Sequence, residues 1–265
     1  MKEQFTKSFA SLRDTNPVAF WKTVCNEVGQ EWRTIYADER ATWIAQTQAQ
    51  NLIYRAWKKD QTPFPLHAKI EVTMQDSALR MDMHHFAFSY DDLVEPNAYA
   101  YIAYIPMESG VLYPCLITDD ICGNLNFDIF SPHCMADYAE RVLGGPFAHK
   151  GTGKRRWEEK VFGRHNAIKW ADHFFFYNQR TYTDRNEGAL SLAEQQKSNK
   201  PLVSIWNEGL TYCELYDNHI ALHKSFVPYV DKHGKGASLG PDQLQSIMPI
   251  LEQAWQEEAV SFITI

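Results

Sequence analysis

Hydrophobic residues in the first sixty positions recur at the three- and four-residue spacing of a helix. The first run starts after Asn16-Pro17, a pair typical of a helix N-terminus, and a second run extends from about Glu31 to Lys59. Two prolines in the segment QTPFP then remove backbone donors and disfavour helical geometry. We therefore predict two N-terminal helices that end before this segment. The apolar positions of the first run are Val18, Trp21, Val24 and Val28.

From about His67 the period of the pattern falls to two, which is typical of strands with one buried face. Runs rich in β-branched and aromatic residues follow one another with short polar joints, such as MESG at 107–110, and these joints suit hairpins better than helical crossovers. We predict five strands near 67–74, 79–83, 99–105, 111–117 and 125–130, and three more near 202–206, 210–216 and 219–227.

Three further helices are expected. One opens at Ser131-Pro132 and ends before Gly144-Gly145, a second covers about Lys154 to Phe175, and a third covers about Asp242 to Glu257. The polar stretch 183–200 between them is predicted to be mostly loop. Because strands and helices form separate runs, we predict an α+β fold: an antiparallel meander sheet packed with N-terminal, central and C-terminal helices. We expect one domain over 1–265, with a helical portion at 1–60 and an α+β body at 67–265.

Composition excludes several classes of protein. With 45% hydrophobic and 22% charged residues, the chain can bury a large core and is not expected to be disordered. Its longest uninterrupted apolar run, AYAYIAYIP, is shorter than the roughly 20 residues of a membrane helix, and its start lacks the apolar region of a signal peptide. The five cysteines are odd in number and lack C-x-x-C spacing. We therefore expect a cytoplasmic protein without a cofactor, a metal or a membrane partner.

The helix predicted after Ser131-Pro132 carries the first candidate chemistry. His133, Asp137 and Arg141 are spaced by four and share one stripe, whereas Tyr138 lies on the opposite side, which we assign to the core. The free N–H groups of a first helical turn attract anions, so His133 could act as acid or base on a phosphodiester, with Asp137 orienting it and Arg141 holding charge. The alternative is an exposed helix face with an ordinary ion pair between Asp137 and Arg141.

This segment resembles the H-A-x-x-R-x-x-E-R helix of the small toxin ribonucleases of the barnase, EndoU and colicin type, in which two helices precede an antiparallel sheet. The match covers His133 and the pair Glu140-Arg141, whereas Asp137 stands where that family has its first arginine. The resemblance implies RNA cleavage without a metal. The departure at Asp137 removes one of the cations that would stabilise the phosphorane.

Two further signals are basic. Segment 150–169 holds seven basic residues against two acidic ones, in a chain whose formal net charge is −7. It could contact the phosphates of RNA or DNA, and the alternative is a solvated helix face. Lys224 shares a predicted strand face with Leu222 and Phe226, so it either marks the rim of the sheet or reaches a carboxylate or phosphate.

These signals leave two kinds of function open. We expect a soluble, noncatalytic interaction or nucleic-acid-associated protein of mobile-element origin, whose partner is RNA or DNA bound through segment 150–169, or a protein. The alternative is a metal-independent ribonuclease-like enzyme that uses His133 as acid or base. The catalytic candidates are His133, Asp137, Arg141 and Lys224, and the nucleic-acid-binding candidates are Lys150, Lys154, Arg155 and Arg156.

Overall fold

The structure is a computed structural model, and it describes residues 10–60, 66–72, 79–87, 89–93, 98–107, 111–119, 123–144, 164–178, 202–206, 208–217 and 219–230. The chain divides into two compact units. The first comprises Met1–Ile105, Cys115–Phe127 and Phe262–Ile265, and the second comprises Pro106–Pro114 and Asp128–Ser261. Helices and strands occur in both units, so the predicted α+β class is confirmed. The expectation of a single domain stays a prediction.

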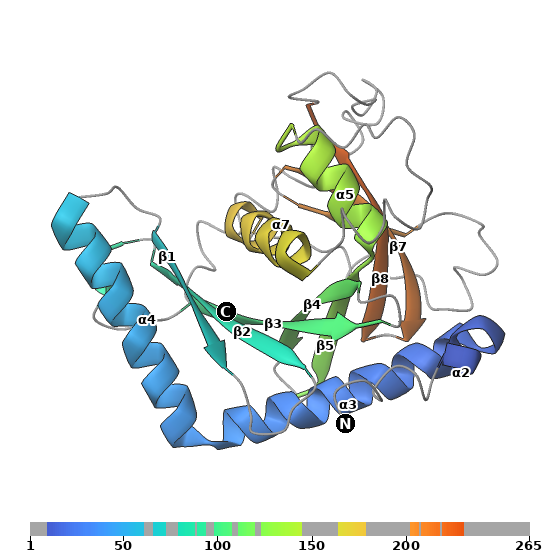
Figure 1. The fold of residues 1–265 in the computed structure, drawn as a ribbon, viewed down its shortest axis with the longest axis horizontal. Helices are drawn as coiled ribbons and strands as arrows, with labels where there is room; N and C mark the ends of the chain where they lie inside the picture. The colour runs from blue at the N-terminus through green and yellow to red at the C-terminus, as the bar shows by residue number, and fades with distance from the viewer. Residues whose placement is uncertain are drawn as a thin grey trace. The chain divides into compact units, whose positions relative to one another are not determined.

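Three helices open the first unit: α2 (Ala10–Thr15), α3 (Pro17–Ala37) and α4 (Glu39–Asp60). Asn16 caps α3 as predicted, because its side-chain oxygen accepts the N–H of Ala19 at 3.0 Å. The sequence pattern places the break between the two long helices near residue 30, but α3 continues to Ala37. The chain turns sharply only at Asp38 (Figure 1), whose carboxylate caps α4 by accepting the N–H of Ala41 at 3.0 Å.

The strands of the first unit follow in the order β1-β2-β3-β4-β5, and β3, β4 and β5 also contribute residues to the second unit. The β1–β2 and β2–β3 pairs are antiparallel, as predicted. Helices α3 and α4 lie on one face of this sheet, since Trp32 of α3 packs edge-on against Tyr101 of β3 and α4 runs along β1. The strands are β1 (Leu66–Val72), β2 (Arg80–Ala87), β3 (Ala98–Pro106), β4 (Leu112–Asp119) and β5 (Leu125–Phe130).

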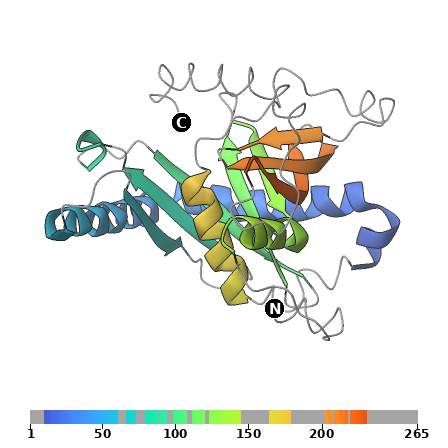
Figure 2. The same cartoon turned by 90° about the horizontal axis from the view of Figure 1, so that it is seen from above.

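The second unit packs helices α5 (Pro132–Arg141) and α7 (Arg164–Tyr177) with β6 (Leu202–Ile205), β7 (Gly209–Asp217) and β8 (Ile220–Pro228). Here the strand order is β5-β8-β7-β6, with β6–β7 and β7–β8 antiparallel. Helix α5 packs on β8, and α7 lies beside α5 (Figures 1 and 2). The core between them is aromatic and comprises Phe130, Tyr138, Phe174, Trp206 and Phe226.

Several expectations concern other parts of the chain. The predicted C-terminal helix, the polar stretch 183–200 and the first part of the helix expected from about Lys154 lie outside the described residues. The four nucleic-acid-binding candidates lie outside them too: Lys150, Lys154, Arg155 and Arg156. Among the helices that are described, none has both the length and the hydropathy needed to cross a membrane.

Candidate functional site

Helix α5 carries three of the four residues that the sequence suggests for catalysis. Ser131 caps it as predicted, with its hydroxyl oxygen accepting the N–H of Cys134 at 3.1 Å. The side chain of His133 is 71% exposed, and its Nε2 lies 3.6 Å from the carboxylate of Asp137. The close contact on this stripe therefore joins His133 to Asp137, and not Asp137 to Arg141.

Asp137 and Arg141 also fasten α5 to strand β8. The guanidinium of Arg141 donates to the carbonyl of Phe226 at 3.1 Å, and Asp137 accepts a backbone hydrogen bond from the same residue. Burial raises the pKa of Asp137, and the charges of His133 and Arg141 oppose this shift. Both side chains are thus engaged in attaching the helix to the sheet, while His133 remains open to solvent.

Lys224 lies at an irregularity in β8. Tyr212 of β7 pairs with Ser225, but the next residue, Cys213, pairs with His223, so Lys224 is the extra residue of a bulge. The bulge keeps Lys224 on the outer face, where its ammonium pairs with the carboxylate of Glu214. Burial alone would raise the pKa of Glu214, but its hydrogen bonds outweigh burial and lower the pKa.

The structure therefore gives Lys224 and His133 separate partners. What touches α5 is the backbone of Lys224, since its carbonyl accepts the hydroxyl of Ser131 at 3.0 Å, and the N–H of Ser131 donates to the carbonyl of His223 at 2.9 Å. The bulge thus supports the start of α5, and the ammonium of Lys224 belongs to the outer face.

The same bulge turns His223 into the core, where it joins a chain of hydrogen bonds. Its Nε2 lies 2.8 Å from the Asp128 carboxylate, its Nδ1 lies 2.7 Å from the Thr211 hydroxyl, and Trp206 Nε1 donates to that hydroxyl at 2.9 Å. A carboxylate only accepts, so Nε2 carries a proton, and when the ring is neutral Nδ1 accepts the Thr211 proton. This order of groups is that of a hydroxyl–histidine–carboxylate triad.

Burial argues against catalysis by this series of hydrogen-bonded side chains. Thr211 and His223 have no exposed surface, and Asp128 is 5% exposed. Phe130 stacks on the imidazole with a centroid distance of 4.4 Å, and Trp206 packs against its edge. A substrate would have to displace this packing. We therefore assign the hydrogen-bonded side chains a structural role, which is to give the polar groups of an aromatic core their hydrogen-bond partners.

A second cluster in the same unit has a partly exposed side. The buried hydroxyl of Tyr138, on the inner side of α5, donates to Glu208 Oε2 at 2.6 Å and lies 2.8 Å from Nδ1 of His173 on α7. Since the tyrosine proton goes to the carboxylate, the Nδ1 of His173 carries the proton of the second bond. His173 and Glu208 are half-buried. One hydroxyl thus holds an imidazole and a carboxylate close together.

Asn178, at the end of α7, fixes the carboxylate of this cluster. Its amide nitrogen donates to Glu208 Oε2 at 3.2 Å and to the carbonyl of Phe174 at 2.9 Å, and its amide oxygen accepts the N–H of Glu208 at 3.0 Å. The sequence pattern did not single out this cluster. Tyr138 is in the core as predicted, but Glu208 looks like an ordinary turn residue before Gly209.

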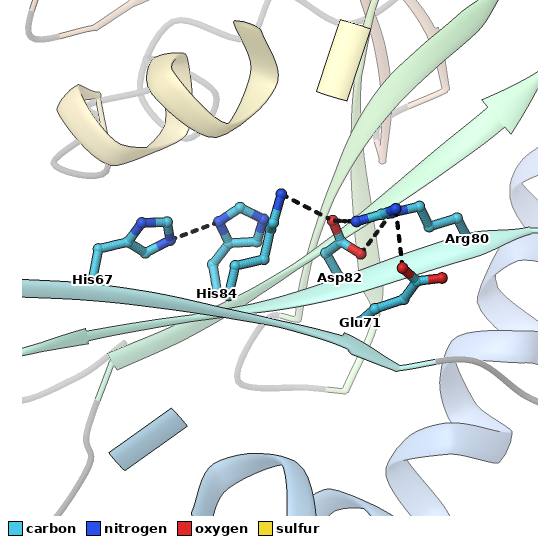
Figure 3. Close-up of polar contacts among 6 residues, drawn as sticks. His67, Glu71, Arg80, Asp82 and His84 are labelled. Atoms are coloured by element: carbon cyan, nitrogen blue, oxygen red, sulfur yellow. Dashed lines mark hydrogen bonds and ion pairs between the residues drawn. The ribbon is translucent and has the colours of Figure 1, made fainter. Parts of the chain in front are cut away.

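The first unit has a polar network of its own, on the sheet face opposite α3 and α4 (Figure 3). Arg80 donates two hydrogen bonds of 2.9 Å to the buried carboxylate of Asp82, and its third nitrogen lies 3.0 Å from Glu71. Lys69 lies 3.7 Å from the same carboxylate of Asp82. Two cations therefore neutralise the buried Asp82, which suits cross-strand stabilisation better than catalysis.

Beside this network, two histidines meet across β1 and β2. His67 Nε2 lies 3.0 Å from His84 Nδ1, and the ring centroid of His67 lies 5.1 Å from that of His84 and 4.9 Å from that of Phe86. Burial lowers the pKa of His67 to about 4, helped by Lys69, and it also lowers the pKa of His84. Both rings are therefore neutral at pH 7, which allows one nitrogen to donate to the other.

Comparison with known proteins adds no relative to this picture. No family model matches the chain, and no curated protein or solved structure is similar enough to count as a match. The function must therefore be argued from the side-chain geometry of the two units.

Proposed function

We propose that the protein is nucleic-acid-associated and that its second unit cleaves RNA by acid–base chemistry without a metal. The observation that carries the proposal is the Tyr138 hydroxyl, which holds the imidazole of His173 and the carboxylate of Glu208 at 2.8 and 2.6 Å. Metal-independent cleavage needs such a proton donor and acceptor close together. Arg141 is not needed in this cluster, because its guanidinium donates to the carbonyl of Phe226.

In this mechanism Glu208 acts as the base and protonated His173 acts as the acid. Glu208 removes the proton of a ribose 2′-hydroxyl, and the 2′-oxygen forms a bond to phosphorus while the bond to the 5′-oxygen breaks. The leaving 5′-oxygen takes a proton from His173, so the products are a 2′,3′-cyclic phosphate and a 5′-hydroxyl. Tyr138 acts as a positioning residue, because its hydroxyl keeps the two groups at fixed distances.

The test uses purified protein, chelator and a single-stranded RNA that carries a fluorophore and a quencher. We expect cleavage of the RNA but not of a DNA of the same sequence, because DNA lacks the 2′-hydroxyl. His173→Ala and Glu208→Gln should each lower the rate by about 10²- to 10⁴-fold. Rates measured across pH should give a bell-shaped profile if the groups act as acid and base.

His133→Ala is the matched control, since it removes the exposed histidine that the sequence pattern favours. We expect this variant to keep the wild-type rate and thermal stability. Loss of activity in His133→Ala alone would show that the acid or base is His133 on the outer face of α5. Intact RNA after long incubation with concentrated wild-type protein would reject the enzyme and support a noncatalytic interaction protein.

A further inference from the structure

We propose that one face of helix α4, in the first unit, binds single-stranded nucleic acid by stacking bases on exposed aromatic rings. The face is defined by the exposed Trp43 and Tyr54 and the half-buried Trp57, with the exposed Tyr90 beside its C-terminal end. This site is separate from the proposed acid–base cluster and uses none of its residues.

Helix α4 buries only a narrow stripe of small or branched side chains. Ala45, Ala49 and Ile53, spaced by four, are buried, and α4 packs on β1 and β2. Trp43 and Tyr54 are eleven residues apart, which is close to three full turns, so they project from the same side of the helix. Their exposed fractions are 65% and 43%, so large aromatic surface remains open to solvent.

The rings near the C-terminal end of α4 form a contiguous group. Trp57 lies 6.0 Å from Tyr54 and 5.4 Å from Tyr90, measured between ring centroids. Tyr90, just before the short helix η1 (Asp91–Leu93), is 53% exposed. The distance along the helix from Trp43 to Trp57 is about 21 Å, enough for several nucleotides. Rings with open faces accept any base, because every base has a π-face.

Charge distinguishes this face from an ordinary apolar docking surface. Helix α4 carries four basic residues against two acidic ones, Glu39 and Asp60 at its two ends, so it is net basic although the whole chain has a formal net charge of −7. Arg40 and Lys58 lie next to the aromatic stripe, near its two ends. Within the described part of the chain, no ion pair engages the four basic residues, which are Arg40, Arg55, Lys58 and Lys59.

These features together favour a single strand over other partners. A protein surface would have to match an aromatic stripe flanked by cations, whereas a single strand offers stacking bases and phosphates in alternation. A duplex has its bases stacked already, so it can meet only the cations. Two acidic residues, Asp91 and Asp92, follow Tyr90 at one end of this face. The carboxylate of Asp92 is held by hydrogen bonds from the backbone and side chain of Ser89, so the cations that we assign to phosphate contact are those of α4.

The experiment measures fluorescence anisotropy of a labelled 15-nucleotide oligo-dT between 50 and 200 mM NaCl. We expect wild-type protein to bind it with a salt dependence of about −0.7 per contacted phosphate, and to bind a duplex of equal length more weakly. Trp43→Ala and Tyr54→Ala should each weaken binding about 5-fold or more at unchanged salt slope. The double variant Arg40→Gln/Lys58→Gln should flatten the slope by about 1.4.

Leu52→Ala is the matched control, because the exposure of Leu52, 48%, lies between those of Trp43 and Tyr54, but its side chain projects from the other side of α4. It should bind as wild type does, and all variants should keep the wild-type melting temperature. No binding by the wild type, equal binding by the aromatic variants, or equal affinity for duplex and single strand would overturn the proposal. DNA cannot undergo the 2′-hydroxyl reaction, so failure here and failure of RNA cleavage are separate results.

Discussion

Single residues in the second unit carry polar groups deep into an aromatic core. Thr211 illustrates the requirement, because its one hydroxyl serves both the Trp206 indole and the His223 imidazole. Without this hydroxyl each of those groups would be a buried polar atom that lacks a hydrogen bond, which lowers the free energy of unfolding by about 1 to 3 kcal/mol. The hydroxyl of Thr211 therefore matters more than its small size suggests.

Thr211→Val tests this role, because valine has nearly the same shape and no hydroxyl. We expect the free energy of unfolding to fall by about 2 to 5 kcal/mol, since two polar groups lose a partner at once. Urea titration followed by tryptophan fluorescence measures the change. Thr211→Ser keeps the hydroxyl and removes one methyl group, so it should lose only about 1 kcal/mol. Equal losses in the two variants would show that packing, and not hydrogen bonding, dominates at this position.

At the scale of elements, α5 is attached to β8 at both of its ends. Ser131 bonds the bulge at the start of the helix, and Arg141 bonds the carbonyl of Phe226 at its end. The helix also carries Tyr138 inward to His173 and Glu208. Any loosening at the start of α5 should therefore displace Tyr138 relative to His173 and Glu208.

Ser131→Ala should destabilise the protein by about 1 to 2 kcal/mol, because it removes the helix cap and the hydrogen bond to Lys224 together. Asn16→Ala is a suitable comparison, since the side chain of Asn16 caps α3 at an exposed position and makes no other hydrogen bond among the described residues. Its loss should be about 1 kcal/mol or less. Thermal melts of the two variants make the comparison, and a larger loss for Asn16→Ala would contradict it.

At the scale of the whole molecule, buried histidines make stability depend on pH. The pKa of His67 is about 4 in the folded protein and near 6.5 in an unfolded chain, and His85 shows the same lowering through burial. Between these values the unfolded chain binds protons that the folded protein excludes. The free energy of unfolding should therefore be unaffected above pH 6.5, fall from pH 6.5 to 4, and lose nothing more from these groups below.

The variant His67→Phe separates this effect from the titration of carboxylates. Phenylalanine keeps a ring that can stack on Phe86 but binds no proton. Between pH 7 and 4 the variant should lose less stability than the wild type, by up to about 3 kcal/mol. Urea midpoints across this range provide the measurement. Parallel pH curves for the two proteins would show that His67 does not titrate between folding states.

Local signals in the sequence account for most of the elements. Alternation, runs of β-branched and aromatic residues and hairpin joints predict the eight strands of the described residues, and the capping pairs at Asn16-Pro17 and Ser131-Pro132 predict the starts of two helices. The cluster of Tyr138, His173 and Glu208 could not be predicted in this way, because these residues meet only through tertiary packing. Asp38 ends a helix without a proline or glycine, so the break there had no strong marker.

The extra residue at Lys224 shifts by one position which residues of β8 face the core. Inward positions follow the usual alternation up to His223 and resume at Phe226, three residues later. A mutant library that assumes strict alternation along β8 would therefore vary outward-facing positions, and not core positions, after Lys224. Alignments with relatives should place a one-residue gap at Lys224 wherever β8 is regular, and chains with that gap would lack the carbonyl that accepts the hydroxyl of Ser131.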